Sequence, residues 1–140
     1  MKWLIDTNIL LAVANAGHPH HAHDSAWLAT NRKDGWGVTT EGYLGAIRIL
    51  MNPVAMKGAH LGARDAVTAI SAALAAPHKG QVIIGGEPDN ALLKTAQGHR
   101  QVMDFYLVQV ARDAGLKLAT RDAGILAAFP KIAIHPARTP

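Results

Sequence analysis

The sequence contains no cysteine, so disulfide bridges and thiolate metal ligands are excluded, and a reducing compartment is the natural setting. It also lacks any apolar run long enough to cross a membrane. The apolar residues near the N-terminus are interrupted by Asp6 and Asn8. What remains is residues 9–14, too short a run for the apolar core of a signal peptide. We therefore expect a soluble cytoplasmic protein that does not bind membranes.

The chain also lacks the glycine-rich loops that bind nucleotide phosphates. Gly85 and Gly86 belong to neither a dinucleotide-binding fingerprint nor a P-loop, so no nucleotide cofactor is expected. There is no internal repeat and no low-complexity segment. With 140 residues, of which 49% are hydrophobic, the chain is long enough to bury a core. We expect a single domain over residues 1–140.

Short apolar segments alternate along the chain with longer helical segments. Strands are predicted at residues 3–5, 36–39, 81–84, 116–119 and 131–134. Helices are predicted at residues 9–16, 24–32, 41–52, 61–76, 89–97 and 98–114, with a further short helix that ends at Phe129. This alternation predicts an α/β fold whose central sheet is mainly parallel.

Acidic residues are scarce, and three of the ten follow predicted strands. Asp6 ends the first strand, Glu41 follows the second, and Asp122 follows the fourth. Because the carboxyl ends of parallel strands meet at one edge of a sheet, where ligand crevices form, we expect these carboxylates to face a common crevice. Taken alone, Asp6 could equally be the N-cap of the helix that follows it. The same arrangement at Asp122 favours the shared crevice.

A fourth carboxylate, Asp104, lies inside a predicted helix. Leu107, Val108 and Ala111 follow it at the spacing of one helical face, so Asp104 is expected on the buried side. A buried carboxylate without a partner is costly. Two interpretations stay open. Either Asp104 forms a buried ion pair with one of the 14 Lys and Arg residues, or it joins the other three carboxylates.

Carboxylates held close together repel one another, and a cation between them removes that repulsion. Oxygen ligands without cysteine suit Mg²⁺ or Mn²⁺. Such an ion activates water and neutralises the charge that develops on a phosphodiester oxygen. The net charge of +4 and the pI of about 9.7 favour a polyanionic partner such as nucleic acid. Together these features predict a metal-dependent nuclease.

Four stretches of the sequence resemble the PIN-domain ribonucleases, specifically the VapC-type toxins of toxin–antitoxin modules. The stretches are Ile5-Asp6-Thr7-Asn8, Thr40-Glu41 with Arg48 and Asn52-Pro53 downstream, residues 100–107 around Asp104, and Ala119-Thr120-Arg121-Asp122. They cover nearly the whole chain in the order of the family. The resemblance implies a three-layer α/β/α sandwich and an endoribonuclease, with tRNA or rRNA as the expected substrate. It also implies Mg²⁺ or Mn²⁺ as the cofactor, a small antitoxin that blocks the site, and a homodimer.

These arguments together assign roles to particular residues. The catalytic set would be Asp6, Glu41, Asp104 and Asp122, of which Asp6, Asp104 and Asp122 would hold the metal. The supporting residues would be Thr7, Asn8 and Thr120, which orient carboxylates, and Arg48 and Arg100, which bind RNA phosphates or balance the acidic charge. Family members often carry a further acid where this chain has Gly124, which leaves open a site with a single metal ion.

Two further groups of residues have simpler interpretations. Four histidines lie within residues 18–23, but their spacing matches no closed tetrahedral zinc site, so we expect a solvated loop. A contact between one of these histidines and RNA is the alternative. The tryptophans are expected in the core; they are Trp3, Trp27 and Trp36.

A second function remains open beside the nuclease. A catalytically silent adaptor with the same fold would bind RNA or protein without cutting either. The four carboxylates are all present, which favours the enzyme, because a silent protein would be free to lose one.

Overall fold

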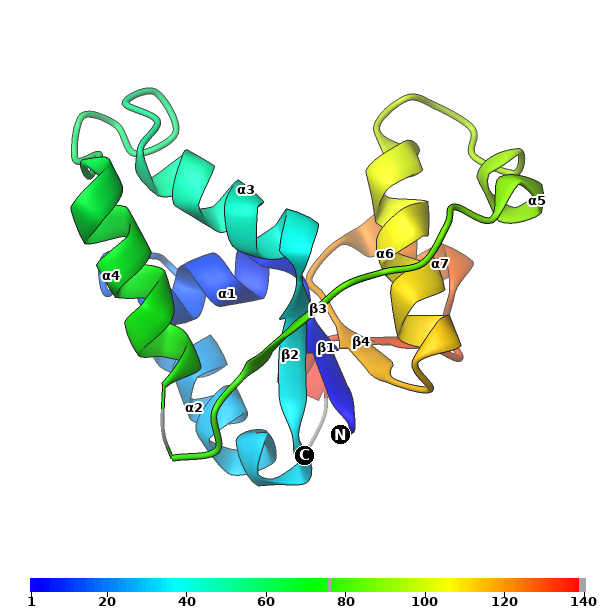
Figure 1. Cartoon of the computed structure of the whole chain (residues 1–140), viewed down its shortest axis with the longest axis horizontal. Coiled ribbons are helices and arrows are strands. Elements are labelled where there is room, and N and C mark those ends of the chain that lie inside the picture. The colour runs from blue at the N-terminus through cyan, green and yellow to red at the C-terminus, as the bar shows by residue number, and fades with distance from the viewer. Residues whose placement is uncertain (76, 139–140) are drawn as a thin grey trace.

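A five-stranded parallel sheet forms the centre of the protein, as the computed structural model of residues 1–75 and 77–138 shows (Figure 1). The strands are β1 (Trp3–Ile5), β2 (Trp36–Thr39), β3 (Gln81–Ile83), β4 (Lys117–Ala119) and β5 (Ala133–Ile134). Their order across the sheet is β3-β2-β1-β4-β5, and each neighbouring pair is parallel. The predicted parallel α/β sheet is therefore confirmed.

Helices connect the strands. They are α1 (Thr7–Ala14), α2 (His21–Asn31), α3 (Thr40–Leu50), α4 (Ala63–Leu74), α5 (Asn90–Leu93), α6 (Gln101–Asp113) and α7 (Ala123–Ala128). Two short 3₁₀ turns, Arg32–Asp34 and Pro136–Arg138, follow α2 and β5. None of these helices is both long and apolar enough to cross a membrane. Ala76, the last residue of a predicted helix, lies outside the described residues.

Several predicted helices differ in extent from the observed ones; α6, for example, begins at Gln101 and not at residue 98, and two further cases have a visible side-chain contact. The helix predicted at residues 89–97 shrinks to the single turn of α5, because the Thr95 hydroxyl donates to the Leu92 carbonyl oxygen at 2.7 Å and takes a helix acceptor. The helix predicted at residues 24–32 begins earlier, at His21, whose Nδ1 lies 2.7 Å from the Ala12 carbonyl oxygen of α1. In each case a side-chain contact with the backbone overrides the local pattern.

The sheet separates two layers of helices, and the alternation along β1 shows why. Trp3 and Ile5 pack into a core with α1, α2, α3 and α4, whereas Leu4 points to the opposite face and packs with α6 and α7. All three tryptophans are buried, as predicted, and Trp3 packs edge-on against Trp27 with ring centroids 5.1 Å apart. The predicted three-layer α/β/α sandwich is confirmed.

The path of the chain creates a crevice at a definite place. It starts in the middle of the sheet at β1 and moves outward through β2 to β3, with its helices on one face. It then crosses to β4 and β5, with α6 and α7 on the other face. The direction of winding therefore reverses between β1 and β4. In open α/β sheets, ligands bind beyond the carboxyl ends of the strands at such a point.

Candidate active site

Asp6 lies where β1 ends, at the point where the winding reverses. Its backbone N–H donates to the Ala119 carbonyl oxygen at 3.0 Å, which extends the pairing of β1 with β4 by one residue. Asp6 occupies the N-cap position of α1, but its side chain makes no capping hydrogen bond. Its Oδ2 instead accepts a hydrogen bond of 2.7 Å from the Thr120 hydroxyl. The interpretation of Asp6 as a mere helix cap is therefore wrong.

Thr120 connects the ends of the two central strands. Its side chain is fully buried, donates to Asp6, and accepts a hydrogen bond of 3.0 Å from the backbone N–H of Asp122. Asp122 in turn caps α7, because its Oδ1 accepts from the backbone N–H of Ile125 at 2.8 Å. Thr120 thus lies between two of the predicted site residues and is hydrogen-bonded to both.

The three aspartates at this edge influence one another electrostatically. Burial raises the pKa of the Asp6 carboxyl, and the charge of Asp122 raises it further, against the hydrogen bonds from Thr120 and the Thr7 backbone. Burial likewise raises the pKa of Asp104, and the charges of Asp122 and Asp6 add to this effect. The charges of Asp6 and Asp122 therefore act on Asp104, and that of Asp122 acts on Asp6, at this end of the sheet.

The position of Asp104 decides between its two interpretations. It lies in the first turn of α6 and is half-buried, while Val108 and Ala111 on the same face are fully buried. Among the described residues, no lysine or arginine forms an ion pair with Asp104. The ion-pair interpretation of Asp104 is therefore wrong, and a buried ion pair occurs elsewhere, between Asp24 and Arg121.

Glu41 lies on α3, which borders the crevice on the side opposite α6. It is the second residue of α3, whose start is capped by the Thr39 hydroxyl accepting from the Gly42 N–H at 2.9 Å. Glu41 lines a cavity of about 320 Å³ together with Pro88, Leu93, Val102, Met103 and Tyr106. Burial raises the pKa of Tyr106, and the charge of Glu41 raises it further. Glu41 therefore faces α6 across the crevice.

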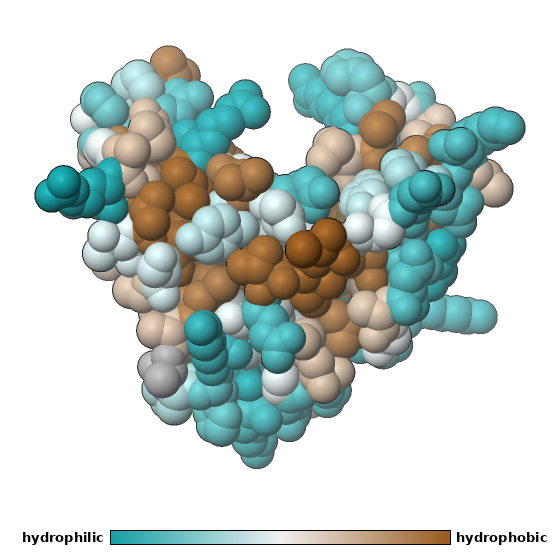
Figure 2. All heavy atoms as spheres, in the orientation of Figure 1, coloured by the Kyte–Doolittle hydropathy of each residue, from teal (hydrophilic) through white to brown (hydrophobic). Residues whose placement is uncertain are grey.

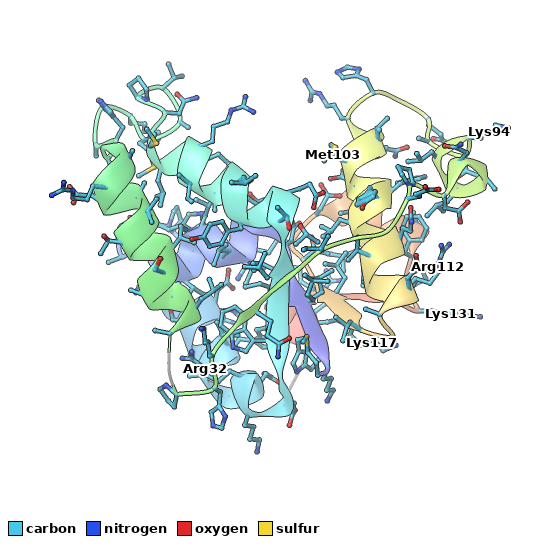
Figure 3. The ribbon with its side chains drawn as sticks, viewed as in Figure 1. Arg32, Lys94, Met103, Arg112, Lys117 and Lys131 are labelled. Atoms are coloured by element: carbon cyan, nitrogen blue, oxygen red, sulfur yellow. The ribbon has the colours of Figure 1, made fainter. Side chains whose placement is uncertain are left out.

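The shape of the molecule agrees with this arrangement. Figure 2 shows a notch between the lobe that carries α3 and α4 and the lobe that carries α5 and α6. Met103, which is exposed, extends from α6 at the rim of this notch (Figure 3). A long polymer has access to such an open crevice from the solvent.

The predicted supporting residues lie in different parts of the structure. Thr7 packs against α3, since a Cβ added to Gly42 would lie 3.3 Å from its Oγ1. Asn8 is exposed and lines a separate groove of about 510 Å³ with His18 and Lys57, rather than contacting Asp6. Thr120 donates its side-chain hydroxyl to the Asp6 carboxylate, and Thr7 contributes a hydrogen bond from its backbone.

Both predicted RNA-binding arginines flank the crevice. Arg48 lies on α3, two turns after Glu41, and Arg100 immediately precedes α6. Both are exposed, and neither guanidinium forms an ion pair or hydrogen bond with another described residue. Their charges are therefore available to a ligand.

Asp24, which was not among the residues predicted from the sequence, is fully buried. It shares one face of α2 with Trp27, Leu28 and Asn31, all of them buried. Asp24 has the same helical spacing to its buried neighbours as Asp104 has to its own, so the sequence already indicated that Asp24 lies on a buried face. Burial raises the pKa of Asp24, but hydrogen bonds from Arg121 and His23 outweigh burial and hold it below its usual range.

The histidine segment is also different from its prediction as a solvated loop. Only its first part is a turn, where the His20 backbone N–H donates to His18 Nδ1 at 3.0 Å. His21 and His23 belong to α2, and His23 Nδ1 lies 3.2 Å from Asp24 Oδ1. The loop prediction is therefore wrong for the second half of the segment.

The donor atoms at the crevice suit a hard divalent cation. Asp6, Asp104 and Asp122 supply carboxylate oxygens that repel one another. Within residues 1–75 and 77–138, no three His, Asp or Glu side chains are arranged so that they could together hold a metal ion. Mg²⁺ usually keeps several waters and takes one or two carboxylates plus substrate phosphates, so an open set fits it. At Gly124 a Cβ would lie 3.1 Å from Asp122 Oδ1, so a side chain there would crowd the cap of α7.

The fold defines a parallel α/β sandwich with carboxylates beyond the carboxyl ends of its central strands. No family model matches the chain. Ribonuclease VapC38 of Mycobacterium tuberculosis is 32% identical over 130 residues, covering 87% of this chain and 86% of that protein. Ribonuclease VapC29 of the same organism is 32% identical over 133 residues, covering 89% of each chain. Ribonuclease VapC39 is 28% identical over 130 residues, covering 89% of this chain and 91% of that protein.

The chain therefore belongs to the VapC family of PIN-domain ribonucleases, the toxins of toxin–antitoxin modules. This membership confirms the resemblance noted in the sequence and the predicted function as a ribonuclease toxin.

Proposed function

We propose that this protein hydrolyses RNA in the crevice between α3 and α6, with Mg²⁺ or Mn²⁺ held by Asp6, Asp104 and Asp122. The observation that carries the proposal is the hydrogen-bonded set of Asp6, Thr120 and Asp122 beyond the carboxyl ends of β1 and β4, where burial and neighbouring aspartate charges also raise the pKa of Asp6. Buried carboxylates that lie close to other carboxylates destabilise the fold, and such groups at the carboxyl ends of strands are typical of a functional site.

Different residues have different roles in this proposal. The Thr120 hydroxyl keeps Asp6 oriented, and the cap of α7 keeps Asp122 oriented. A bound divalent ion would activate water and neutralise charge on the scissile phosphodiester. In this proposal Glu41, which is exposed on α3, would accept a proton from the attacking water.

The substrate in this proposal is a cellular RNA, with tRNA or rRNA as the expected class. The net charge of +4 favours a polyanion, although the crevice itself is acidic. Arg48 and Arg100 resolve this conflict, because they flank the crevice and offer free guanidinium groups to RNA phosphates. RNA would bind through its phosphates at the rim and be cut between them.

A cognate antitoxin would inhibit the enzyme by covering this crevice. Carboxylates without a cation attract a basic side chain, and the planar fork of an arginine pairs well with them. Exposed apolar side chains of α6 line the cavity and would receive the rest of the antitoxin; they include Val102 and Met103. We further infer a homodimer and a cytoplasmic location, as the sequence predicted.

Metal-dependent cleavage tests the proposal directly. RNA is incubated with the purified protein in EDTA, and then with added Mg²⁺ or Mn²⁺, and the 5′ ends of the products are sequenced. We expect no cleavage in EDTA and recovery with either ion. Undiminished cleavage in EDTA would exclude the proposed mechanism. Binding of RNA without cleavage under any of these conditions would indicate the silent adaptor instead.

Competition with Mg²⁺ tests the antitoxin. If an antitoxin arginine occupies the carboxylates, the apparent inhibition constant weakens as Mg²⁺ rises, beyond the change produced by Na⁺ at equal ionic strength. Equal effects of the two salts would rule out direct occlusion of the carboxylates.

A further inference from the structure

A buried ion pair lies directly behind the candidate site. The Asp24 side chain is 0% exposed and that of Arg121 is 17% exposed. Arg121 Nε lies 3.2 and 3.0 Å from the two carboxylate oxygens, and a terminal guanidinium nitrogen lies 2.6 Å from Oδ1. This fork fixes both the position and the orientation of the guanidinium. The pair joins α2 to the segment between β4 and α7, 97 residues away in the sequence.

Arg121 is the central residue of a segment whose three members are each tethered to a different element. Thr120 donates to Asp6 after β1, Arg121 binds Asp24 in α2, and Asp122 caps α7. Because the Thr120 hydroxyl also accepts from the Asp122 N–H, the segment couples one site aspartate to another. A shift of Arg121 would disturb both hydrogen bonds of Thr120.

Neither stability nor RNA binding accounts well for this pair. A buried ion pair is often no more stabilising than well-packed apolar residues of similar volume, since both charges lose their hydration. The Arg121 guanidinium already contacts Asp24 and lies 3.2 Å from His23 Nδ1, so it has little left to offer a phosphate. Its placement next to Thr120 is the feature that needs an explanation.

We propose that Asp24 and Arg121 are positioning residues of the ribonuclease site. Their ion pair fixes residues 120–122, and so holds the Thr120 hydroxyl between Asp6 and Asp122 at the spacing that the reaction requires. The proposal rests on the proposed function of Asp6 and Asp122. Neither member of the pair contacts the substrate; both act through Thr120.

Steady-state kinetics separate positioning from RNA contact. The variants are Arg121→Lys, which keeps the charge but loses the fork, Arg121→Gln, and Asp24→Asn. We expect kcat to fall about 10- to 100-fold in each, as for residues that orient metal ligands, with KM for RNA nearly unchanged. A raised KM in the Arg121 variants, with kcat and Asp24→Asn unaffected, would assign Arg121 to RNA binding and overturn the proposal.

A double variant separates positioning from stability. Each single neutralisation leaves one buried charge without its partner, whereas Asp24→Asn combined with Arg121→Gln removes both charges. The double variant should therefore recover much of the thermal stability lost in the single variants, while kcat stays low. Recovery of kcat together with stability would show a purely structural pair. The matched control is Arg112→Gln, which breaks ion pairs with Asp89 and Asp113 on the side of α6 away from the notch (Figure 3).

Amide hydrogen exchange in metal-free protein provides a measurement that does not depend on catalysis. The Asp122 N–H donates to Thr120, so it should exchange slowly in the natural protein and in Arg112→Gln, and faster in Arg121→Gln and Asp24→Asn. Unchanged exchange with unchanged kcat would overturn the proposal. If Asp6→Asn kept full activity while exchange at Asp122 still responded to Arg121, the proposed function would fail and the positioning effect would stand.

Discussion

Two strand-to-helix junctions carry the same sequence pattern but use their aspartates differently. At the junction of β4 with α7, Asp122 caps its own helix by accepting from Ile125. At the junction of β1 with α1, the Asp6 side chain does not cap its helix. Its Oδ2 instead accepts a hydrogen bond from the hydroxyl of Thr120, which belongs to the neighbouring junction. Asp122 is therefore held locally, whereas Asp6 is held from the strand beside it.

The comparison shows how the two junctions depend on each other. Thr120 belongs to the second junction but orients the carboxylate of the first. Burial raises the pKa of Asp6, so its charge is maintained at a cost that the Thr120 hydrogen bond offsets in part. The β4–α7 junction thus supplies one carboxylate and organises another.

Removing the charge at either junction should have the largest effect. Asp6→Asn and Asp122→Asn keep the shape of the side chain and remove the proposed metal ligand. We expect cleavage rates to fall more than about 100-fold in both, since residues that merely orient metal ligands typically cost 10- to 100-fold. Initial rates on RNA at saturating Mg²⁺ measure this. Full activity in only one variant would show that a single junction serves catalysis.

Removing the hydroxyl shared by the junctions should affect stability and activity together. Thr120→Val leaves Asp6 Oδ2 and the Asp122 N–H without this partner, at a cost of about 1–3 kcal/mol in the free energy of unfolding. The cleavage rate should also fall about 10- to 100-fold. Urea unfolding and initial rates check the two effects. Thr120→Ser is the matched control, because it keeps the hydroxyl and should stay near the natural protein in both.

The cap of α7 by Asp122 is a second difference between the two junctions, and its expected effect is smaller. Asp122→Ala should lower the free energy of unfolding by about 1 kcal/mol, because α7 loses the side chain that accepts from its first turn. Asp122→Asn should lose much less, since asparagine caps equally well. Thermal unfolding in metal-free buffer measures the difference. Equal losses in the two variants would indicate that charge at this position, and not capping, stabilises the fold.

The pH dependence of stability should reveal the cost of the site. Because the folded-state pKa values of Asp6 and Asp104 are raised, the folded protein binds protons more readily than the unfolded chain. Metal-free protein should therefore become more stable as the pH falls from neutral through these raised pKa values. Asp24 contributes in the opposite direction. Because the pKa of Asp24 is lowered in the folded protein, its charged carboxyl stabilises the fold at pH values above the ordinary pKa of 3.8, and this stabilisation is lost as the pH falls below that value.

Thermal unfolding across pH separates these contributions. Asp6→Asn should be more stable than the natural protein at neutral pH and should show a weaker gain on acidification. If the stability of Asp6→Asn rose more steeply on acidification than that of the natural protein, the charged Asp6 carboxyl would not be a source of the lost stability at neutral pH. Asp34→Asn, at an exposed surface ion pair with Lys2, serves as the control and should follow the natural curve.

The smallest expected effect concerns the rim of the crevice. Arg48→Ala and Arg100→Ala should each lower the slope of log affinity against log salt by about 0.7, the value for one phosphate contact on single-stranded nucleic acid. Binding to a catalytically inactive Asp6→Asn background measures the slopes. Lys33→Ala, at an exposed residue after α2, is the control. Unchanged slopes for both arginines would remove them from RNA binding.

The sequence by itself determined the local features of this protein. Apolar runs bounded by turn residues located the five strands, and β2 has the predicted bounds Trp36–Thr39. The position of Asp6 directly after one strand, and of Asp122 three residues after another, placed both at the edge of the sheet, and helical spacing placed Asp104 on the inner face of α6. These features follow from the regular geometry of strands and helices, which repeats over a few residues.

Only the tertiary structure decided which polar groups became partners. Thr120 reaches Asp6 across 114 residues because β4 pairs with β1, and Arg121 reaches Asp24 across 97 because α2 packs behind that junction. Periodicity reports which face a residue occupies but not which strand lies beside it. Likewise, the raised pKa of Asp6 and the lowered pKa of Asp24 both belong to buried carboxylates. Their opposite signs come from the partners that folding supplied, since desolvation alone raises the pKa of both.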